Sequence, residues 1–481
     1  MNIQSHLFVL AYLPLTIVLW RLSRRWLGGL AARVILLCAG LLFCAWGSPL
    51  SLLVLCGEGA VSYLLGRGMG RPGAPRKLLL AIGAAVLLAV LVFFKYTGFL
   101  LSLTPLEGLF TPPAAWAPLG LSFLTFQQIF WLRDCYMGEA GEASALDYAC
   151  CLTFFATVTC GPITRVGELA PRFRRPAPFD WNDLAGGFYC FALGLGKKVI
   201  VAGMLANGAN FGFAKAGALS PADSAMAILC YTLQIYFDFS GYCDMAAGMA
   251  RMMGIALPVN FNSPYKALSI KDFWGRWHIT LSRFFRSCVY IPLGGNRRGM
   301  AVTCRNIMII FLLSGIWHGA GWGFLVWGAL HGAAMVLQRL CGGRIKLPKP
   351  LAWLLTFLFV NVAWVFFRAD SLGQAFALLG GLFLSGWGLP SYEFISSLPV
   401  EVMTNLLTLL QQLLQPGGRA LIYWIPMLIV PAALGLLACP NPITQSERLR
   451  PTVWKLLVTV ACVVASVLLF SGVNTFIYAN F

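Results

Sequence analysis

The sequence predicts an all-α polytopic membrane protein. Of its 481 residues, 59% are hydrophobic and 11% are charged, whereas about a quarter of the residues of a soluble domain are charged. Apolar runs long enough to cross a bilayer recur along the chain, and we count roughly eleven to thirteen of them. The net charge of +18 comes from basic residues in the short loops between these runs. Cytoplasmic loops carry such an excess, so the charge does not indicate nucleic acid as a partner.

The first four apolar runs alternate across the bilayer in agreement with the charges between them. They are Leu7–Trp20, Leu30–Trp46, Leu50–Leu65 and Leu78–Phe94. Arginines follow the first run at Arg21, Arg24 and Arg25, and the basic stretch Arg67–Lys77 follows the third. Both loops are therefore expected in the cytoplasm. No basic region precedes the first run and no small-residue cleavage site follows it, so we expect it to remain as a transmembrane helix.

The alternation breaks after the next run, Leu119–Leu132. The apolar piece Tyr148–Ile163 ends in RVGELAPRFRRP, which is also basic. If both of its flanks are cytoplasmic, this piece must enter the membrane and return to the same side. Such backbone is tolerated only where protein or a wet cavity surrounds it, and Gly161-Pro162 supplies a break. We therefore predict a re-entrant segment.

The remaining runs complete one membrane domain over residues 1–481. Leu184–Leu205 carries Lys197 and Lys198 at its middle, which favours two short helices, or one tilted helix with lysines that reach toward the interface. The later runs are Ala225–Met249, Ile307–Trp317, Trp322–Leu337, Leu351–Phe367, Ala375–Leu384, Leu421–Leu437 and Val453–Phe470. We expect an external amphipathic helix over Glu393–Gln415. No internal repeat and no soluble domain is visible.

An interfacial helix is predicted on the cytoplasmic side. The segment Arg251–Arg305 holds nine Lys and Arg residues against the single Asp272. Apolar residues recur there at helical spacing, and charged residues lie opposite. The apolar set is Ile270, Phe273, Trp274, Trp277, Leu281, Phe284 and Phe285. This pattern is typical of a helix that lies in the membrane surface.

Three of the four histidines fall between Asn260 and Gly332. His318 sits among glycines in an apolar run, where an ionisable side chain is a functional-site candidate, and it could act as a general base on a hydroxyl. A structural histidine that bonds a neighbouring helix is about as common, but two further histidines nearby favour chemistry. His278 fits a catalytic group or an interfacial anchor equally well. His331 is expected to be structural.

Two further groups of residues are candidates for substrate contacts. Gln234, Asp238 and Tyr242 are four residues apart and so share one helix face, where they could line a polar path or clamp two helices together. The turn Leu293–Gly299, with Asn296 and Arg297, is glycine-rich and basic. Such a turn could hold the phosphate of an acyl donor, or it could be an ordinary loop.

Other chemistries find no support in the sequence. No HExxH motif or cysteine pair accompanies the histidines, so we expect no metal. The fifteen cysteines form no CxxC pair, and we expect small buried side chains. Walker, GxGxxG and GxSxG motifs are also absent from the sequence, which argues against an ATPase, a dinucleotide enzyme and a serine hydrolase.

Several long motifs resemble the membrane-bound O-acyltransferase family, in its bacterial alginate O-acetylation branch. They are PLGLSFLTFQ from Pro118, GPITR from Gly161, YFDFSGYCDMAAG from Tyr236, FNSPYKALSIKDFWGRWHITLS from Phe261, LGGNRRG from Leu293, GIWHGAGWGFLVWGALHG from Gly315, WVFFRA from Trp364 and the tail FIYANF. They fall mainly in a core over residues 118–368. Residues 1–117 match loosely, and residues 369–481 contribute C-terminal helices. The family usually has arginine where Gly275 stands, and often aspartate where Ser287 stands.

The resemblance implies a many-helix fold around a central tunnel in the bacterial inner membrane. It implies His318 as the catalytic histidine and His278 as the second histidine, with Gln234, Asp238, Tyr242, Arg276, Trp317, Asn296 and Arg297 on the path of the substrates. The donor would be a cytoplasmic thioester of coenzyme A or of a carrier protein, with no bound cofactor. A periplasmic SGNH-type acetyltransferase would be the partner. The expected function is O-acetylation of an alginate- or cellulose-type exopolysaccharide.

Two alternatives remain open. One is acyl or D-alanyl transfer to teichoic acid or peptidoglycan. The other is a transporter without enzymatic activity, which would share buried charges and broken helices but would more often show internal repeats.

Overall fold

The computed structural model describes residues 3–105, 118–342, 347–400, 404–405, 407–408 and 424–470. These residues form helices and their connections. Within these described ranges, seven helices are long and apolar enough to span a membrane, and three more are apolar but shorter. The protein is therefore a multi-pass membrane protein, as predicted. The count is lower than the eleven to thirteen apolar runs in the sequence, partly because several of those runs fold into short helices.

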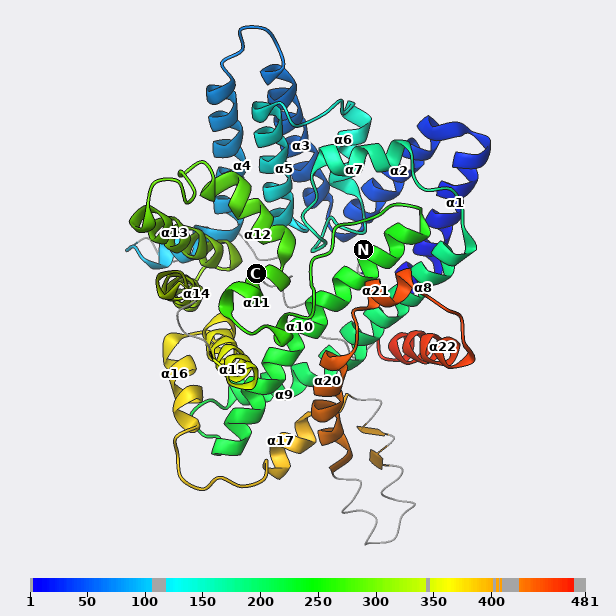
Figure 1. The fold of residues 1–481 in the computed structure, drawn as a ribbon. Coiled ribbons are helices and arrows are strands. Elements are labelled where there is room, and N and C mark those ends of the chain that lie inside the picture. The colour runs from blue at the N-terminus through cyan, green and yellow to red at the C-terminus, as the bar shows by residue number, and fades with distance from the viewer. Residues whose placement is uncertain are drawn as a thin grey trace.

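The N-terminal third surrounds the re-entrant segment (Figure 1). Its elements are η1 (Phe8–Tyr12), α1 (Leu13–Trp26), α2 (Gly28–Gly47), α3 (Pro49–Met69), α4 (Arg76–Ser102), α5 (Leu121–Met137), α6 (Ala145–Thr153) and α7 (Val166–Arg174). Local sequence sets several helix starts. Ser48 accepts from the Ser51 amide before Pro49, and Ser144 and Asp147 form a capping box at α6. Both satisfy amides that a helix start leaves without partners.

The middle of the chain forms the long central pair of helices. It comprises α8 (Trp181–Gly196), the π-helix η3 (Lys197–Val201), α9 (Ala202–Ala214) and α10 (Pro221–Met252). The next elements cross between this pair and the N-terminal third, and are η4 (Pro264–Lys266), α11 (Ile270–Arg276), α12 (Ile279–Phe285) and η5 (Arg286–Tyr290). In Figure 1, α11 lies near the centre of the molecule and α12 above it, toward α5.

The last part supplies three spanning helices and a C-terminal cover. The spanning helices are α13 (Met300–His318), α14 (Trp322–Cys341) and α15 (Lys349–Arg368). They are followed by α16 (Leu372–Gly381), α17 (Tyr392–Ser397), η6 (Ile425–Leu428), α20 (Ile429–Ala438), α21 (Pro442–Glu447) and α22 (Val453–Leu468). Of the predicted external helix Glu393–Gln415, the structure describes the start as part of α17, and most of the rest lies outside the described residues. The tail FIYANF lies outside them as well.

The contacts at the two flanks and the tip of the segment agree with the re-entrant prediction. At the entry, Asp147 pairs with Arg33 and Arg174. At the exit, Arg165 pairs with Asp134, near the end of α5. Between these flanks the backbone at Val158 reaches the opposite end of α5, where a Cβ on Gly120 would meet the Val158 carbonyl. Gly120 also has a φ of +68°, so this close approach requires glycine.

Two other expectations are wrong in detail. Lys197 and Lys198 do not reach for the interface. Lys197 is largely and Lys198 fully buried, and they pair with Asp244 and Asp238 of α10. The π-helix η3 turns both consecutive lysines toward that helix. The interfacial helix is also not continuous, because it breaks at Trp277 and His278 into α11 and α12. Most of its apolar face is buried in the protein rather than laid on lipid.

Candidate active site

His278 occupies the break between α11 and α12. Its backbone has φ 44° and ψ 53°, in the left-handed region that non-glycine residues rarely adopt. Its side chain is fully buried. Strained backbone of this kind persists only where the surroundings hold it, and it is concentrated at functional sites. In a continuous helix His278 would be one more residue on a helix face. The break instead places its imidazole in the interior of the protein.

Asn260 fixes the tautomer of that imidazole. The Asn260 Oδ1 atom accepts from the backbone amide of Thr280 at 3.2 Å and from the Thr280 hydroxyl at 2.9 Å. Because that amide can only donate, the oxygen assignment is secure and the atom is an acceptor. His278 Nδ1 lies 3.2 Å from the same oxygen, so it carries the proton. The Nε2 lone pair remains, and this atom has no hydrogen-bond partner among the described residues.

The re-entrant segment holds this region from the other side. The Ile163 amide donates to the Thr280 hydroxyl at 3.0 Å. Arg283 donates to the Ile163 carbonyl at 3.4 Å and forms an ion pair with Glu168 of α7. The motifs GPITR and WHITLS are therefore joined in space, although more than a hundred residues separate them. Together with Asn260 they immobilise the start of α12, and with it His278.

Trp317 packs close to both of the histidines that the sequence singled out. Its ring centroid lies 6.3 Å from that of His278 and 4.7 Å from that of His318. The indole stacks on Phe126 of α5 at 4.9 Å and donates to the Ser122 carbonyl at 3.3 Å. The structure therefore brings His278, Trp317 and His318 together, as expected from their shared stretch of sequence.

His318 is the last residue of α13 and is buried. Trp327 of α14 and Phe367 of α15 contact its ring edge-on, at 5.1 and 5.0 Å. Gly315, one turn earlier, allows α14 to approach, because a Cβ there would meet the Phe324 carbonyl. Small residues at a helix crossing in the membrane serve this purpose. The imidazole is therefore enclosed by aromatic side chains from two further helices.

His331 packs among aromatic side chains, which suits the structural role expected for it. Its Nδ1 atom accepts from the Trp274 indole at 3.2 Å, so in the neutral ring Nε2 carries the proton. Aromatic rings surround it on α11, α13, α14 and α15, among them Phe273, Trp327 and Phe359. The histidine thereby fixes the indole of Trp274.

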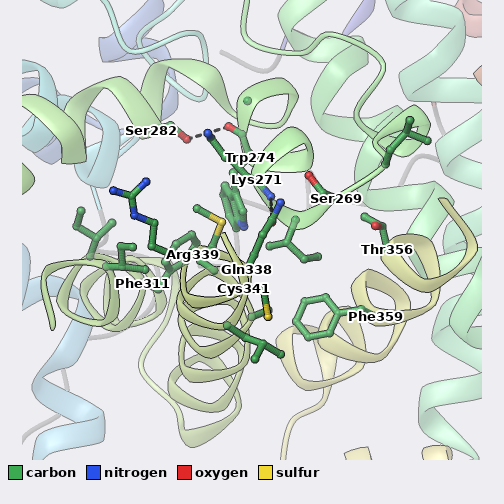
Figure 2. A pocket seen from close by; sticks show the side chains of 18 of the residues that line it. Ser269, Lys271, Trp274, Ser282, Phe311, Gln338, Arg339, Cys341, Thr356 and Phe359 are labelled. Atoms are coloured by element: carbon green, nitrogen blue, oxygen red, sulfur yellow. Dashed lines mark hydrogen bonds between the residues drawn. The ribbon is translucent and has the colours of Figure 1, made fainter. Parts of the chain in front are cut away.

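Two cavities meet α13 near His318. The larger measures about 1250 Å³ and lies between α11, α12, α13, α14 and α15. It extends along α13 from Thr303 to Ser314, one turn before His318. Figure 2 shows Trp274, Phe311 and Phe359 around this space, with Lys271 and Arg339 also on its lining.

The smaller cavity, of about 640 Å³, begins directly after His318. Gly319, Phe367 and Lys95 are among its lining residues. The lining residues of the two cavities therefore flank His318 along α13, although neither His318 nor His278 lines either cavity.

The predicted polar face of α10 is used mainly to hold helices. Asp238 pairs with Lys198, and the Tyr242 hydroxyl bonds the Thr159 hydroxyl of the re-entrant segment. The Gln234 Oε1 atom has no hydrogen-bond partner among the described residues. None of the three lines either of the two cavities. These contacts favour the helix clamp that the sequence left open for Asp238 and Tyr242.

The donor-side candidates lie around the larger cavity. Asn296 lines it, and the glycine turn that carries Asn296 and Arg297 is tied to α13 by Asn306, which donates to the Leu293 and Gly295 carbonyls. Arg276 instead pairs with Asp272 on its own helix at 2.7 Å. The neighbouring Gly275 lines the cavity with open space where a Cβ would stand. No group of three potential metal ligands occurs among the described residues.

A comparison with family models places this site in a known family. The model of the membrane-bound O-acyltransferase family matches residues 80–372, a range that contains both histidines and both cavities. The chain belongs to the membrane-bound O-acyltransferase family. It is therefore an acyltransferase enzyme, as predicted.

Relatives of known name make the comparison more specific. A peptidoglycan O-acetyltransferase of Helicobacter pylori is 40% identical over 416 residues, which cover 79% of each chain. A probable alginate O-acetylase AlgI of Pseudomonas aeruginosa is 35% identical over 423 residues, 85% of this chain and 80% of the relative. A teichoic acid D-alanyltransferase of Bacillus subtilis is 30% identical over 233 residues, 45% of this chain and 58% of the relative.

Sequence reasoning missed several residues of the site. Asn260 gave no signal because an asparagine in a loop has many ordinary uses, and only the break at His278 reveals its partner. Lys95 and Tyr96 directly follow the predicted run Leu78–Phe94 and were not among the candidates. In the structure both reach the end of α13. A lysine next to a tyrosine at the end of an apolar run is a weak signal, since snorkelling explains it equally well.

Proposed function

We propose that this acyltransferase passes an acetyl group from a cytoplasmic thioester to an acceptor on the outer side of the bacterial inner membrane. The observation that carries the proposal is that both imidazoles pack against Trp317, with one cavity lined by α13 residues before His318 and another by residues directly after it. A transfer reaction between two compartments needs a reacting group that both substrates can approach. A transporter would not need an oriented, buried imidazole pair.

The reaction balances with His318 as general base. The acceptor hydroxyl gives its proton to the imidazole as its oxygen attacks the thioester carbonyl. The carbon–sulfur bond then breaks, the acetyl group remains on the acceptor as an ester, and the thiolate departs toward the donor side. The imidazolium returns its proton to the thiolate, directly or through water. The buried position excludes bulk water, which would otherwise hydrolyse the thioester.

His278 is proposed to position the donor. In the tautomer that Asn260 imposes, Nε2 accepts a hydrogen bond rather than donating one. It could hold an amide or thiol of the donor arm, and it could protonate a leaving thiolate only after taking a proton itself. Positioning is therefore the better-supported of the two roles that the sequence suggested for it.

The larger cavity suits a phosphate-bearing thioester. Its walls are mostly apolar, and Lys271, Arg286 and Arg339 supply positive charge while no acidic side chain lines it. Coenzyme A and the arm of a carrier protein share this chemistry. Arg276 and Arg297, which follow the lining residues Gly275 and Asn296 in the sequence, would add charge beside the cavity. The open space at Gly275, where the family usually carries arginine, would leave room for a different donor or a different docking surface.

The proposed acceptor system is an extracellular polysaccharide of the alginate or cellulose type, with a periplasmic SGNH-type partner completing the transfer. The similarity to alginate O-acetylases over 85% of this chain supports it. Peptidoglycan is a second candidate, because the relative at 40% identity is a peptidoglycan O-acetyltransferase. The match to D-alanyltransferases covers less than half of the chain, which favours acetyl over D-alanyl.

The test measures base-labile esters on both polymers in cells that lack the protein and in cells complemented with it. Exopolysaccharide and peptidoglycan are purified separately, and the acetate and D-alanine released by mild alkali are quantified. In cells with the intact protein we expect released acetate from one of the two polymers. We expect none in cells that lack the protein or carry His318→Gln. Acetate on peptidoglycan alone would select the second candidate. D-alanine, or ester content independent of the protein, would overturn the proposal.

A further inference from the structure

Each of the last four backbone carbonyls of α13 accepts a hydrogen bond. The final four carbonyls of a helix have no partner within it and need one from outside. Here the Gly315 carbonyl accepts from the Gly319 amide at 3.4 Å. The Ile316 carbonyl accepts from the Tyr96 hydroxyl at 2.5 Å. The carbonyls of Trp317 and His318 accept from Lys95 Nζ at 2.6 and 3.0 Å.

All three N–H donors of the Lys95 ammonium group have partners at the end of α13 or the start of α5. An ammonium group has three N–H donors. Two go to the last carbonyls of α13, and the third lies 3.3 Å from the Ser122 hydroxyl at the start of α5. No donor remains for a substrate, although the side chain lines the smaller cavity. The cation also lies 5.8 Å from the centre of the Trp317 ring, in cation–π range. Lys95 therefore acts on the site through the helix it holds.

The local sequence makes that support necessary. His318 is the last helical residue, and Gly319 continues in extended backbone before Gly321 and the start of α14. Glycines offer little resistance to unwinding. A positive charge also stabilises the carbonyl end of a helix. Without the ammonium the last turn of α13 would loosen, and the His318 ring would lose its fixed direction.

We propose that Lys95 is a positioning residue for acyl transfer, which holds α4, α5 and the end of α13 together so that the His318 imidazole keeps its place between the two cavities. The inference rests on the proposed role of His318. The inference goes beyond that role because Lys95 lies outside the histidine motifs, on a helix that the resemblance covers only loosely.

The experiment pairs hydrogen–deuterium exchange with ester formation. Lys95→Met keeps the length of the side chain and removes the charge and all three donors, and Lys215→Met, at an exposed lysine, is the matched control. In Lys95→Met we expect faster amide exchange confined to residues 315–321. We also expect ester formation per folded protein to fall by roughly 10- to 100-fold, the scale of a misplaced catalytic group. Lys95→Arg should recover part of that loss.

Two further variants separate the possible failures. Tyr96→Phe removes one carbonyl partner only, and should raise exchange at the same residues even if Lys95→Met does not fold. His318→Gln should abolish esters without altering exchange. If His318→Gln stays active, the proposed function fails, and exchange still reports on the hold of Lys95. Unchanged exchange at residues 315–321, or a normal rate of ester formation despite faster exchange, would overturn the inference.

Discussion

Replacing Asn260 with alanine tests whether the orientation of the His278 imidazole, and not only its presence, matters for activity. One oxygen of Asn260 accepts from His278 Nδ1, from the Thr280 amide and from the Thr280 hydroxyl. At about 1 kcal/mol for each neutral hydrogen bond, the substitution lowers the free energy of unfolding by roughly 3 kcal/mol. That is a large share of a typical stability of about 5–15 kcal/mol, but it leaves a folded protein to assay.

The activity effect follows from the tautomer. Without Asn260 Oδ1, the proton of His278 is free to move to Nε2, and the ring is free to turn. We expect ester formation per folded protein to fall by roughly 10- to 100-fold. The assay is the rate at which alkali-labile acetate appears on the cell-surface polymer, normalised to the monodisperse protein recovered in detergent. Asn262→Ala, two residues away and without contact to His278, serves as the matched control.

A folded Asn260→Ala protein with the wild-type rate would refute the reasoning. It would mean that the tautomer of His278 does not matter, and with it the positioning of the donor through Nε2. A low rate in the Asn262→Ala control as well would assign the loss to the loop as a whole rather than to the shared oxygen.

Three other variants test the scaffold. Asp238→Asn should lower the free energy of unfolding by about 3–5 kcal/mol, because it removes the carboxylate that neutralises the buried Lys198, whereas Lys198→Met combined with Asp238→Leu should recover most of that loss. Burial alone would raise the pKa of the Asp147 carboxyl, but hydrogen bonds from Arg174, Ser144 and Arg33 outweigh it and hold that pKa well below its usual range. The wild type should therefore keep this contribution above about pH 4 and lose it as the pH falls further, and thermal unfolding of Asp147→Asn should show no such loss. Gly275→Arg should fold normally, because open space lies where its Cβ would stand, and it should change ester formation only if the donor passes this mouth of the larger cavity.

The fold was predictable where composition and charge act locally. Apolar runs predicted where most of the long helices lie, and the four arginines after Ile163 pointed to the re-entrant segment, because a segment with cytoplasmic charge at both ends must turn back. The lysine pair was not predictable in the same way. Lys197 and Lys198 form ion pairs with Asp244 and Asp238 on another helix. Both lysines face that helix because the backbone there is a π-helix.

The histidines of the site could be predicted, but not its other residues or its geometry. Three histidines in one stretch of sequence suggested a shared pocket, and His278 and His318 do both pack against Trp317. The periodicity of residues 270–285, however, predicted one helix, and the hydrogen bonds of Asn260 to His278 and Thr280 override that local preference. Long-range contacts of this kind leave no trace in the spacing of apolar residues.

The most direct test of the central claim is the acetyl ester content of the cell-surface polysaccharide in a His318→Ala strain, with His278→Ala beside it. The variant protein must elute from detergent gel filtration as the wild type does, and polymer yield must be normal. The account predicts loss of esters in His318→Ala. Retained esters in a folded His318→Ala protein would contradict it, and would make His318 a structural residue of α13.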